Sequence, residues 1–200
     1  FISFTGILQN LPKNFTTVLS VVKFCSILCE IITISGGIHT SIVSDIEKLK
    51  KEKNAVILAH YYVDEDVQDV ADYIGDSFYL SKVATKVSQD RIIFAGVEFM
   101  GESAKILNPK KRVFMPDMNA DCPMAHMADK DEILALREKY DDLAVVCYIN
   151  STAELKKYSD VCVTSSNAVK IVKNLPNKNI FFIPDRNLGS YVAKQCPDKN

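Results

Sequence analysis

AVILAHYY, residues 55–62, decides the fold of this chain, because it joins a continuous apolar run to a polar, aromatic end. An apolar run without alternation is typical of a strand that is buried on both faces of a parallel sheet. Similar runs recur at RIIFAG (91–96), VFM (113–115), LAVVCYI (143–149), DVCVTS (160–165) and NIFFI (179–183). These six runs predict parallel strands.

Between the runs, apolar residues follow helical spacing. One such set is Val67, Val70, Ala71 and Ile74. It predicts a helix that ends at Gly75. A second helix is predicted with Ser77 as its N-cap, and a third from the capping box at residues 151–154. Strands that alternate with helices predict an α/β fold, in which helices cover both faces of a parallel sheet.

Two six-residue strings indicate an internal repeat. FMPDMN (114–119) and FIPDRN (182–187) share the pattern F-x-P-D-x-N, and each follows a helical stretch and ends an apolar run. We therefore expect repeated three-layer α/β/α units, with copies at about residues 42–120 and 140–200.

The composition excludes several classes of protein. The chain has 200 residues, a formal net charge of −1 and 48% hydrophobic residues, so nothing favours binding to nucleic acid or to an anionic membrane. Six cysteines without dense spacing indicate reduced, cytosolic thiols rather than a disulfide scaffold. The glycine-rich motifs for dinucleotides and triphosphates are absent from the sequence.

The first forty residues read as an unassigned apolar extension. Val18–Ile34 carries Lys23 and Glu30 within its apolar residues, which argues against a membrane-spanning helix. Cys25 and Cys29 would share a helical face and are most simply packing residues. Because the chain begins with Phe and ends without a closing pattern, we expect it to be a fragment.

Polar residues collect where the predicted strands end. Ligands bind beyond the carboxyl ends of the strands in open parallel sheets. Ser77, Asn150 and Ser165 suit the binding of a carboxylate or phosphate. The other strand-end candidates are His60, Tyr61, Tyr62, Gly96, Glu98, Asp117, Asn119, Cys122, Tyr148, Thr164, Ser166, Asp185, Arg186 and Asn187. Each also has a local explanation, such as an N-cap for the two serines. Together, and close to helix N-termini, they favour a small anionic substrate.

Cys122 differs from the other cysteines because it lies in a loop, DCPMA, after an apolar run. It is a candidate metal ligand, although Cys122 and His126 alone would not make a structural zinc site. Cys147 and Cys162 lie inside apolar strands and read as small buried hydrophobic residues. The role of Cys196 stays open.

Six stretches resemble the quinolinate synthase family, which makes a precursor of NAD and carries an iron–sulfur cluster. They are AVILAHYYVDEDVQDVADYIGDSFYLS (55–81), FAGVEFMGESAKILNP (94–109), MPDMNADCPMAHM (115–127), VCYINSTAELK (146–156), CVTSSNAVKIV (162–172) and IPDRNLGSYVAKQ (183–195). The resemblance runs from about Ile42 to Asn200. It implies three homologous units around a pseudo-threefold axis. Here these would be residues 41–130, a truncated second unit at 131–200, and a third unit that is absent.

The resemblance also implies a cofactor. The family holds one [4Fe–4S] cluster by one cysteine from each unit, and Cys122 stands at the first of these positions. The remaining ligands would come after Asn200, so this fragment alone is expected to be inactive. With three cysteine ligands, one iron keeps an open position and acts as a Lewis acid.

The implied reaction condenses iminoaspartate (iminosuccinate) with dihydroxyacetone phosphate and releases phosphate, water and quinolinate. His60 and Tyr62 match catalytic positions. His60, Ser77, Tyr148, Asn150 and Ser165 match substrate-binding positions. A cytoplasmic location is implied, together with transient contact with the L-aspartate oxidase or dehydrogenase that makes iminoaspartate. The alternatives are a non-catalytic module that binds small anions and an enzyme of the diphthamide-synthesis type.

Overall fold

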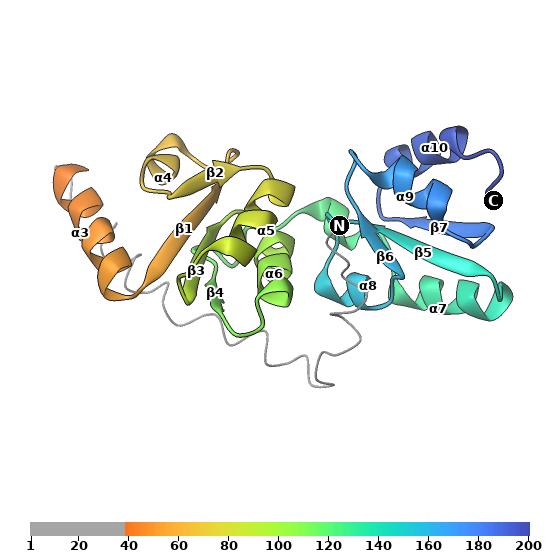
Figure 1. Ribbon diagram of the computed structural model, residues 1–200, viewed down its shortest axis with the longest axis horizontal. Helices are drawn as coiled ribbons and strands as arrows, with labels where there is room; N and C mark the ends of the chain where they lie inside the picture. The colour runs from red at the N-terminus through yellow and green to blue at the C-terminus, as the bar shows by residue number, and fades with distance from the viewer. Residues whose placement is uncertain (1–38) are drawn as a thin grey trace. The chain divides into compact units, whose positions relative to one another are not determined.

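The computed structural model describes residues 39–200 (Figure 1). Val18–Ile34, with Cys25 and Cys29, lies outside the described residues. By its contacts the described part forms a first unit that ends at Asp121 and a second unit from Cys122 to Asn200. The boundary predicted after residue 130 would instead leave the loop from Cys122 in the first unit. Among residues 39–200, every helix is too short or too polar to cross a membrane.

The first unit is a parallel sheet with helical crossovers. Its elements are α3 (His39–Glu52), β1 (Ala55–His60), α4 (Glu65–Asp69), β2 (Tyr73–Gly75), α5 (Ser77–Lys86), β3 (Arg91–Ala95), α6 (Glu98–Leu107) and β4 (Arg112–Phe114). The strands lie in the order β2-β1-β3-β4, and every pair is parallel. All six residues of β1 are buried, as expected for a strand covered on both faces.

The second unit repeats this plan. Its elements are the 3₁₀ helix η2 (Pro123–His126), α7 (Lys130–Lys139), β5 (Leu143–Tyr148), α8 (Ala153–Lys157), β6 (Val161–Val163), α9 (Ala168–Asn174), β7 (Asn179–Ile183) and α10 (Arg186–Gln195). Its strands lie in the order β6-β5-β7 and are also parallel.

Alternate residues of β5 serve two separate cores. Val145 and Cys147 pack with residues of α7 and α8, such as Ile133. Val146 packs on the other side with residues of α9 and α10, such as Val172. Figure 1 shows the two pairs of helices on opposite faces of this sheet. The predicted three-layer α/β/α architecture is therefore confirmed.

Equivalent residues of the two units are separated by a constant number of positions in the sequence. Ala55 pairs with Arg91 across β1 and β3, and Leu143 pairs with Asn179 across β5 and β7. Each second-unit residue is numbered 88 higher than its counterpart, as 143 exceeds 55. The same offset relates β2 to β6, α4 to α8 and α6 to α10, end to end.

The pairing of FMPDMN with FIPDRN was therefore wrong, although the repeat is real. FIPDRN follows β7, which corresponds to β3, whereas FMPDMN follows β4. The shared aspartate reflects common turn chemistry. Asp185 accepts hydrogen bonds from the Asn187 and Leu188 amides, and Asp117 accepts one from the Asn119 amide, so both close a turn after a strand.

The helix predicted to end at Gly75 was also wrong in its second half. α4 ends at Asp69, and Tyr73–Gly75 is the edge strand β2, parallel to β1. Apolar residues at 67, 70, 71 and 74 fit helical spacing, but pairing with β1 determines the conformation of the last of them.

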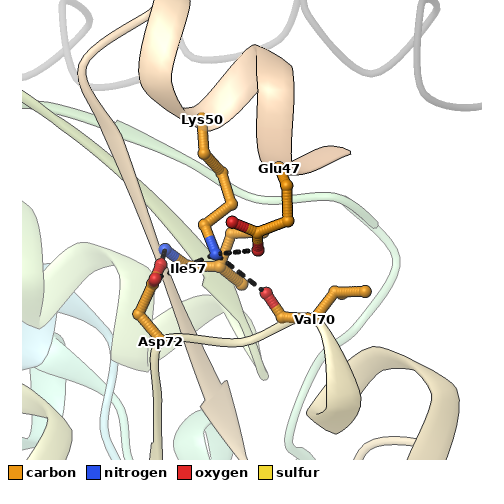
Figure 2. Close-up of polar contacts among 5 residues, drawn as sticks. All are labelled: Glu47, Lys50, Ile57, Val70 and Asp72. Carbon is orange, nitrogen blue, oxygen red and sulfur yellow. Dashed lines mark hydrogen bonds and ion pairs between the residues drawn. The ribbon is translucent and has the colours of Figure 1, made fainter. Parts of the chain in front are cut away.

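Asp72 fixes the point at which β2 begins. Its backbone amide donates to Ile57 O at 2.9 Å, and its Oδ2 accepts from the Ile57 amide at 2.8 Å. Lys50 Nζ lies 2.9 Å from Asp72 Oδ1 and 2.6 Å from Glu47 Oε1, and it donates to Val70 O at 3.3 Å (Figure 2). This group of contacts, which we call the aspartate clamp, joins α3 to β1 and to the crossover between β1 and β2.

The second unit has an equivalent clamp at Asp160. Its Oδ2 accepts from the Val145 amide at 2.7 Å, and its own amide donates to Val145 O at 2.9 Å. Arg137 of α7 supplies the cation, 2.8 Å away. In both units, an aspartate and a basic side chain from the preceding helix thus hold β1 or β5 in place.

Two predicted helix caps are displaced by one residue. Asp76, not Ser77, caps α5 and accepts from the Tyr79 amide at 2.7 Å. Thr152, not Ser151, caps α8 and accepts from the Leu155 amide at 3.3 Å. Glu154 forms an ion pair with Lys130 at 3.1 Å instead of completing a capping box.

Candidate functional site

Each unit brings one strand-end side chain and one serine to the carboxyl edge of its sheet. In the first unit His60 pairs with Gly75, and the next amide, that of Tyr61, donates to Gly75 O at 3.3 Å. Ser77 follows two residues after that strand end. His60 and Ser77 therefore share one edge of the first sheet.

The second unit repeats this edge with different side chains. Tyr148 pairs with Val163, and the Ile149 amide donates to Val163 O at 2.9 Å. Ser165 again follows the strand end by two residues. By the 88-residue offset, Tyr148 is the counterpart of His60, and Ser165 is the counterpart of Ser77. Of the two side chains at each edge, only the serine is the same residue type in both units.

His60 is held as a neutral imidazole. Its side chain is only 4% exposed, and its Nδ1 accepts a hydrogen bond from the Tyr62 amide at 3.2 Å. Burial lowers the pKa of His60 from its ordinary value, although the nearby Asp76 carboxylate acts to raise it. Because Nδ1 is an acceptor, the proton of the neutral ring lies on Nε2, which is then a hydrogen-bond donor.

Two tyrosines lie against this imidazole. The rings of Tyr61 and Tyr62 are centred 4.5 Å and 4.3 Å from the ring of His60. Tyr62 is 83% exposed, so its hydroxyl group is in contact with solvent beside a buried base. The pair combines a sheltered imidazole with an accessible phenol, two groups that act in general acid–base chemistry.

Other side chains, not those of Ser77 and Ser165, cap the helix and hold the turn at these two positions. Asp76 caps α5, so Ser77 Oγ is not needed there. Around Ser165, the turn is held by Asn167 Oδ1, which accepts from the Thr164 amide at 2.7 Å, and by the 2.9 Å bond between the Thr164 and Ser166 hydroxyl groups. Ser165 itself is exposed. Neither serine hydroxyl group therefore serves as the helix cap or the turn acceptor at its position.

Tyr148 and Asn150 are half-buried on the loop that leaves β5. Ser151 is fully buried and holds this loop, since its Oγ donates to Tyr148 O at 2.8 Å and its amide to Ile149 O at 2.8 Å. This bonding fixes the backbone from which the two candidate side chains extend.

Cys122 is set apart from the apolar cores. It precedes η2 as a half-exposed residue whose side chain makes no capping bond, and Pro123 is the first residue of that helix. Cys147 and Cys196 are instead buried. Just before it, Ala120 O accepts from the Glu98 amide at 2.8 Å, which fixes the preceding loop at the N-terminus of α6. Between residues 39 and 200, no three His, Cys, Asp or Glu side chains are grouped as metal ligands.

Asp76 is a residue of this site that sequence reasoning missed. It caps α5 and its charge acts on His60. The signal was present, because an aspartate directly before a helical run is as good an N-cap as a serine. The prediction that Ser77 is the N-cap wrongly assigned its hydroxyl group to the helix.

Burial of His60 predicts an acid-sensitive first unit. The folded-state pKa lies below the ordinary value of 6.5, so as pH falls below 6.5 the unfolded chain takes up a proton first, and stability declines until the folded pKa is reached. We expect His60→Asn to weaken this decline, measured as the urea midpoint against pH. The exposed His126, changed to Asn, is the control. Equal slopes in the wild type and His60→Asn would contradict the prediction.

Comparison with known proteins identifies similar chains. The family model described as "Quinolinate synthetase A protein" matches residues 44–200. A protein of Fusobacterium nucleatum named quinolinate synthase is 67% identical over 155 residues, which cover 78% of this chain and 52% of that protein. Proteins of the same name from Caldicellulosiruptor saccharolyticus and Clostridioides difficile are each 55% identical, over 78% of this chain and 52% and 51% of their own lengths. The chain thus spans about half the length of the curated relatives it matches.

Proposed function

This chain belongs to the quinolinate synthetase A family, and from that membership we propose that it supplies part of the active site of a quinolinate synthase. In this proposal the enzyme condenses iminoaspartate with dihydroxyacetone phosphate, releases phosphate and water, and forms quinolinate for NAD biosynthesis. The proposed location is the cytoplasm.

The observation that carries the proposal is the repeated sheet edge. His60 with Ser77, and Tyr148 with Ser165, occupy equivalent positions in two copies of one fold. Both proposed substrates are small anions, one a dicarboxylate and the other a phosphate ester. Hydroxyl donors at the carboxyl ends of parallel strands suit such groups. Two related edges match a reaction that must bind two anionic substrates.

The proposed chemistry of the first edge is proton transfer. His60 donates from Nε2 to a substrate oxygen, because its Nδ1 is engaged by the Tyr62 amide. Tyr62, whose ring lies 4.3 Å from the imidazole, exchanges protons with solvent. Isomerisation moves protons between carbon and oxygen, and loss of water takes a proton from carbon and delivers one to the departing oxygen; such a pair supplies a donor and an acceptor for these transfers.

The proposed chemistry of the second edge is binding. Tyr148 and Asn150, on the loop held by Ser151, and Ser165 in the turn after β6 would donate hydrogen bonds to carboxylate or phosphate oxygens. Ser77 would do the same at the first edge. Bonds to a charged acceptor contribute roughly 1.5–3 kcal/mol each.

Cys122 is the residue that we propose as ligand to a [4Fe–4S] cluster. It fits this role because its thiol is half-exposed in a loop and caps no helix, unlike the buried thiols of Cys147 and Cys196. Bound there, the cluster would supply a Lewis acid that polarises substrate oxygen or nitrogen. The equivalent position in the next repeat lies 88 residues after Cys122 and so beyond Asn200, which means that the described part would contribute a single ligand.

The proposed partner is the enzyme that makes iminoaspartate, an L-aspartate oxidase or dehydrogenase. Imines hydrolyse readily in water, and a short transfer between enzymes would limit that loss.

Ser165→Ala in the full-length protein is expected to raise the KM for one substrate about tenfold, which corresponds to the loss of about 1.4 kcal/mol of binding. Iron content should not change. Ser166→Ala is the matched control, since the Ser166 hydroxyl bonds Thr164 and is assigned no ligand. Steady-state kinetics with each substrate varied in turn provides the measurement. Equal effects of the two changes would count against a binding role for Ser165.

The whole proposal is tested on full-length protein purified without oxygen. We expect a brown protein containing about four iron atoms per chain that forms quinolinate from the two substrates. A colourless, iron-free protein that binds dicarboxylates or phosphate esters without turnover would favour a small-anion-binding module instead.

A further inference from the structure

The two cysteines that sequence reasoning treated as packing residues form a pair. Cys147 of β5 and Cys162 of β6 are direct partners in the parallel register of the second sheet. Neighbours in this register project from the same face of the sheet, and both side chains belong to the core that includes Ile133 and Leu155. The Cys147 thiol donates a hydrogen bond to Tyr148 O at 3.4 Å.

The spacing of this pair is compatible with a covalent bond. Neighbouring strands lie roughly 4.7–4.9 Å apart. This falls within the Cα separation of roughly 4.4–6.8 Å that disulfides span. Both cysteines are free thiols in the structure. The spacing of the two backbones is therefore within the range that a disulfide spans.

The surroundings of the pair are more polar than packing alone requires. Lys156 of α8 is fully buried, and its charge acts on both thiols. The hydroxyl groups of Ser151 and Ser159 donate to Tyr148 O and to Leu155 O. The neighbouring Cys162 thiol, and to a smaller extent the charge of Lys156, lower the pKa of Cys147 to about 7, while Cys147 and burial hold the pKa of Cys162 well above its ordinary value.

Such an arrangement differs from that of an inert core cysteine. Apolar burial alone raises the pKa of a thiol and makes it unreactive, whereas a neighbouring cation and hydrogen-bond donors favour the thiolate. Cys147 is buried and Cys162 is half-buried, so Cys162 is the more accessible thiol of the pair.

We propose that Cys147 and Cys162 form a redox modification site, in which hydrogen peroxide or a small hydroperoxide converts the dithiol to a disulfide with Lys156 supporting the thiolate. The thiolate of the pair attacks peroxide oxygen, the O–O bond breaks, and sulfenic acid forms as hydroxide leaves. The second thiol then attacks the sulfenic sulfur, the S–S bond forms, and water departs. Two thiols and one hydrogen peroxide thus give one disulfide and two waters. This proposal is independent of the quinolinate reaction.

The test uses the full-length protein, fully reduced and then exposed to one equivalent of hydrogen peroxide. Remaining thiols are alkylated, and the protein is cut with trypsin. Cleavage after Lys139, Lys156, Lys157 and Lys170 separates the two cysteines. We expect a linked pair of peptides, 140–156 with 158–170, lighter by two hydrogens than the sum of its parts and released by dithiothreitol. Alkylated Cys147 and Cys162 after other cysteines have oxidised would overturn the proposal, as would disulfides that join either of them elsewhere.

Variants separate the roles of the three residues. Cys162→Ser should abolish the link and leave a sulfenic acid on Cys147, detected as the gain of one oxygen atom in the mass of the intact protein. Lys156→Met should slow formation of the link several-fold. Lys157→Met is the matched control, because Lys157 is the exposed neighbour of Lys156 on α8. Equal rates in the two lysine variants would overturn the part assigned to Lys156, and the wild-type peptide map tests the pair itself without any substitution.

Discussion

Cys122→Ser in the full-length protein is expected to abolish both the iron–sulfur cluster and the formation of quinolinate. Serine replaces a soft thiolate ligand with a hydroxyl group that stays protonated at neutral pH and binds iron weakly. Because the proposed cluster is held by only three cysteines, loss of one leaves too few ligands to retain it. The measurements are iron and sulfide content, visible absorbance and quinolinate production, all without oxygen.

Cys147→Ala is the matched control for this change. Cys147 is buried inside β5 and lies outside the proposed active site, so its removal should cost about 1 kcal/mol of stability and leave the cluster in place. Equal iron content in the two variants would refute the assignment of Cys122 as a ligand. A folded Cys122→Ser protein, verified by circular dichroism, excludes misfolding as the cause of iron loss.

Asp72→Ala is expected to destabilise the first unit by about 3 kcal/mol, the largest stability effect that we predict. The change removes the acceptor of the Ile57 amide within a buried strand and takes a carboxylate from Lys50, whose side chain is only 9% exposed. Burial acts to lower the pKa of Lys50, but its hydrogen bonds to Asp72 and Glu47 raise it overall, so the lysine depends on these partners. A shift of this size lowers the melting temperature of a small unit by about 15 °C.

Glu47→Ala is the control within the same clamp (Figure 2). Glu47 also contacts Lys50, but its side chain is 47% exposed and bonds no strand amide in the described part of the chain. We expect its removal to cost at most about 1 kcal/mol. Urea unfolding of both variants, together with hydrogen exchange at the Ile57 amide, provides the comparison. Similar losses in the two variants would show that the bond to the strand amide contributes little.

Much of the fold followed from local sequence. Continuous apolar runs predicted β1, β3, β4, β5, β6 and β7, because strands buried on both faces cannot carry alternating polar residues. The strand-end position of His60 and Tyr148 followed from the same runs, since the chain turns polar where it leaves the sheet. Six stretches between residues 55 and 195 together indicated the family, and the similarity to known quinolinate synthases confirmed it.

Other features depend on contacts between segments distant in the sequence. β2 forms because Asp72 bonds the Ile57 amide and Tyr73 pairs with Leu58, which overrides local helical spacing. Whether Asp76 or Ser77 caps α5 depends on the backbone geometry of one helix turn, and it decides whether the Ser77 hydroxyl group is used as the cap.

The sequence by itself determined the fold class, the family and the edge at which candidate residues gather. These features depend on continuous apolar runs and on the polar residues that directly follow them. Only the tertiary structure decided the 88-residue register of the repeat and the pairing of Cys147 with Cys162. Strand register is set by hydrogen bonds between separate segments, and one residue of slippage would turn every side chain to the opposite face. Two cysteines fifteen residues apart therefore became neighbours through the sheet rather than through the chain.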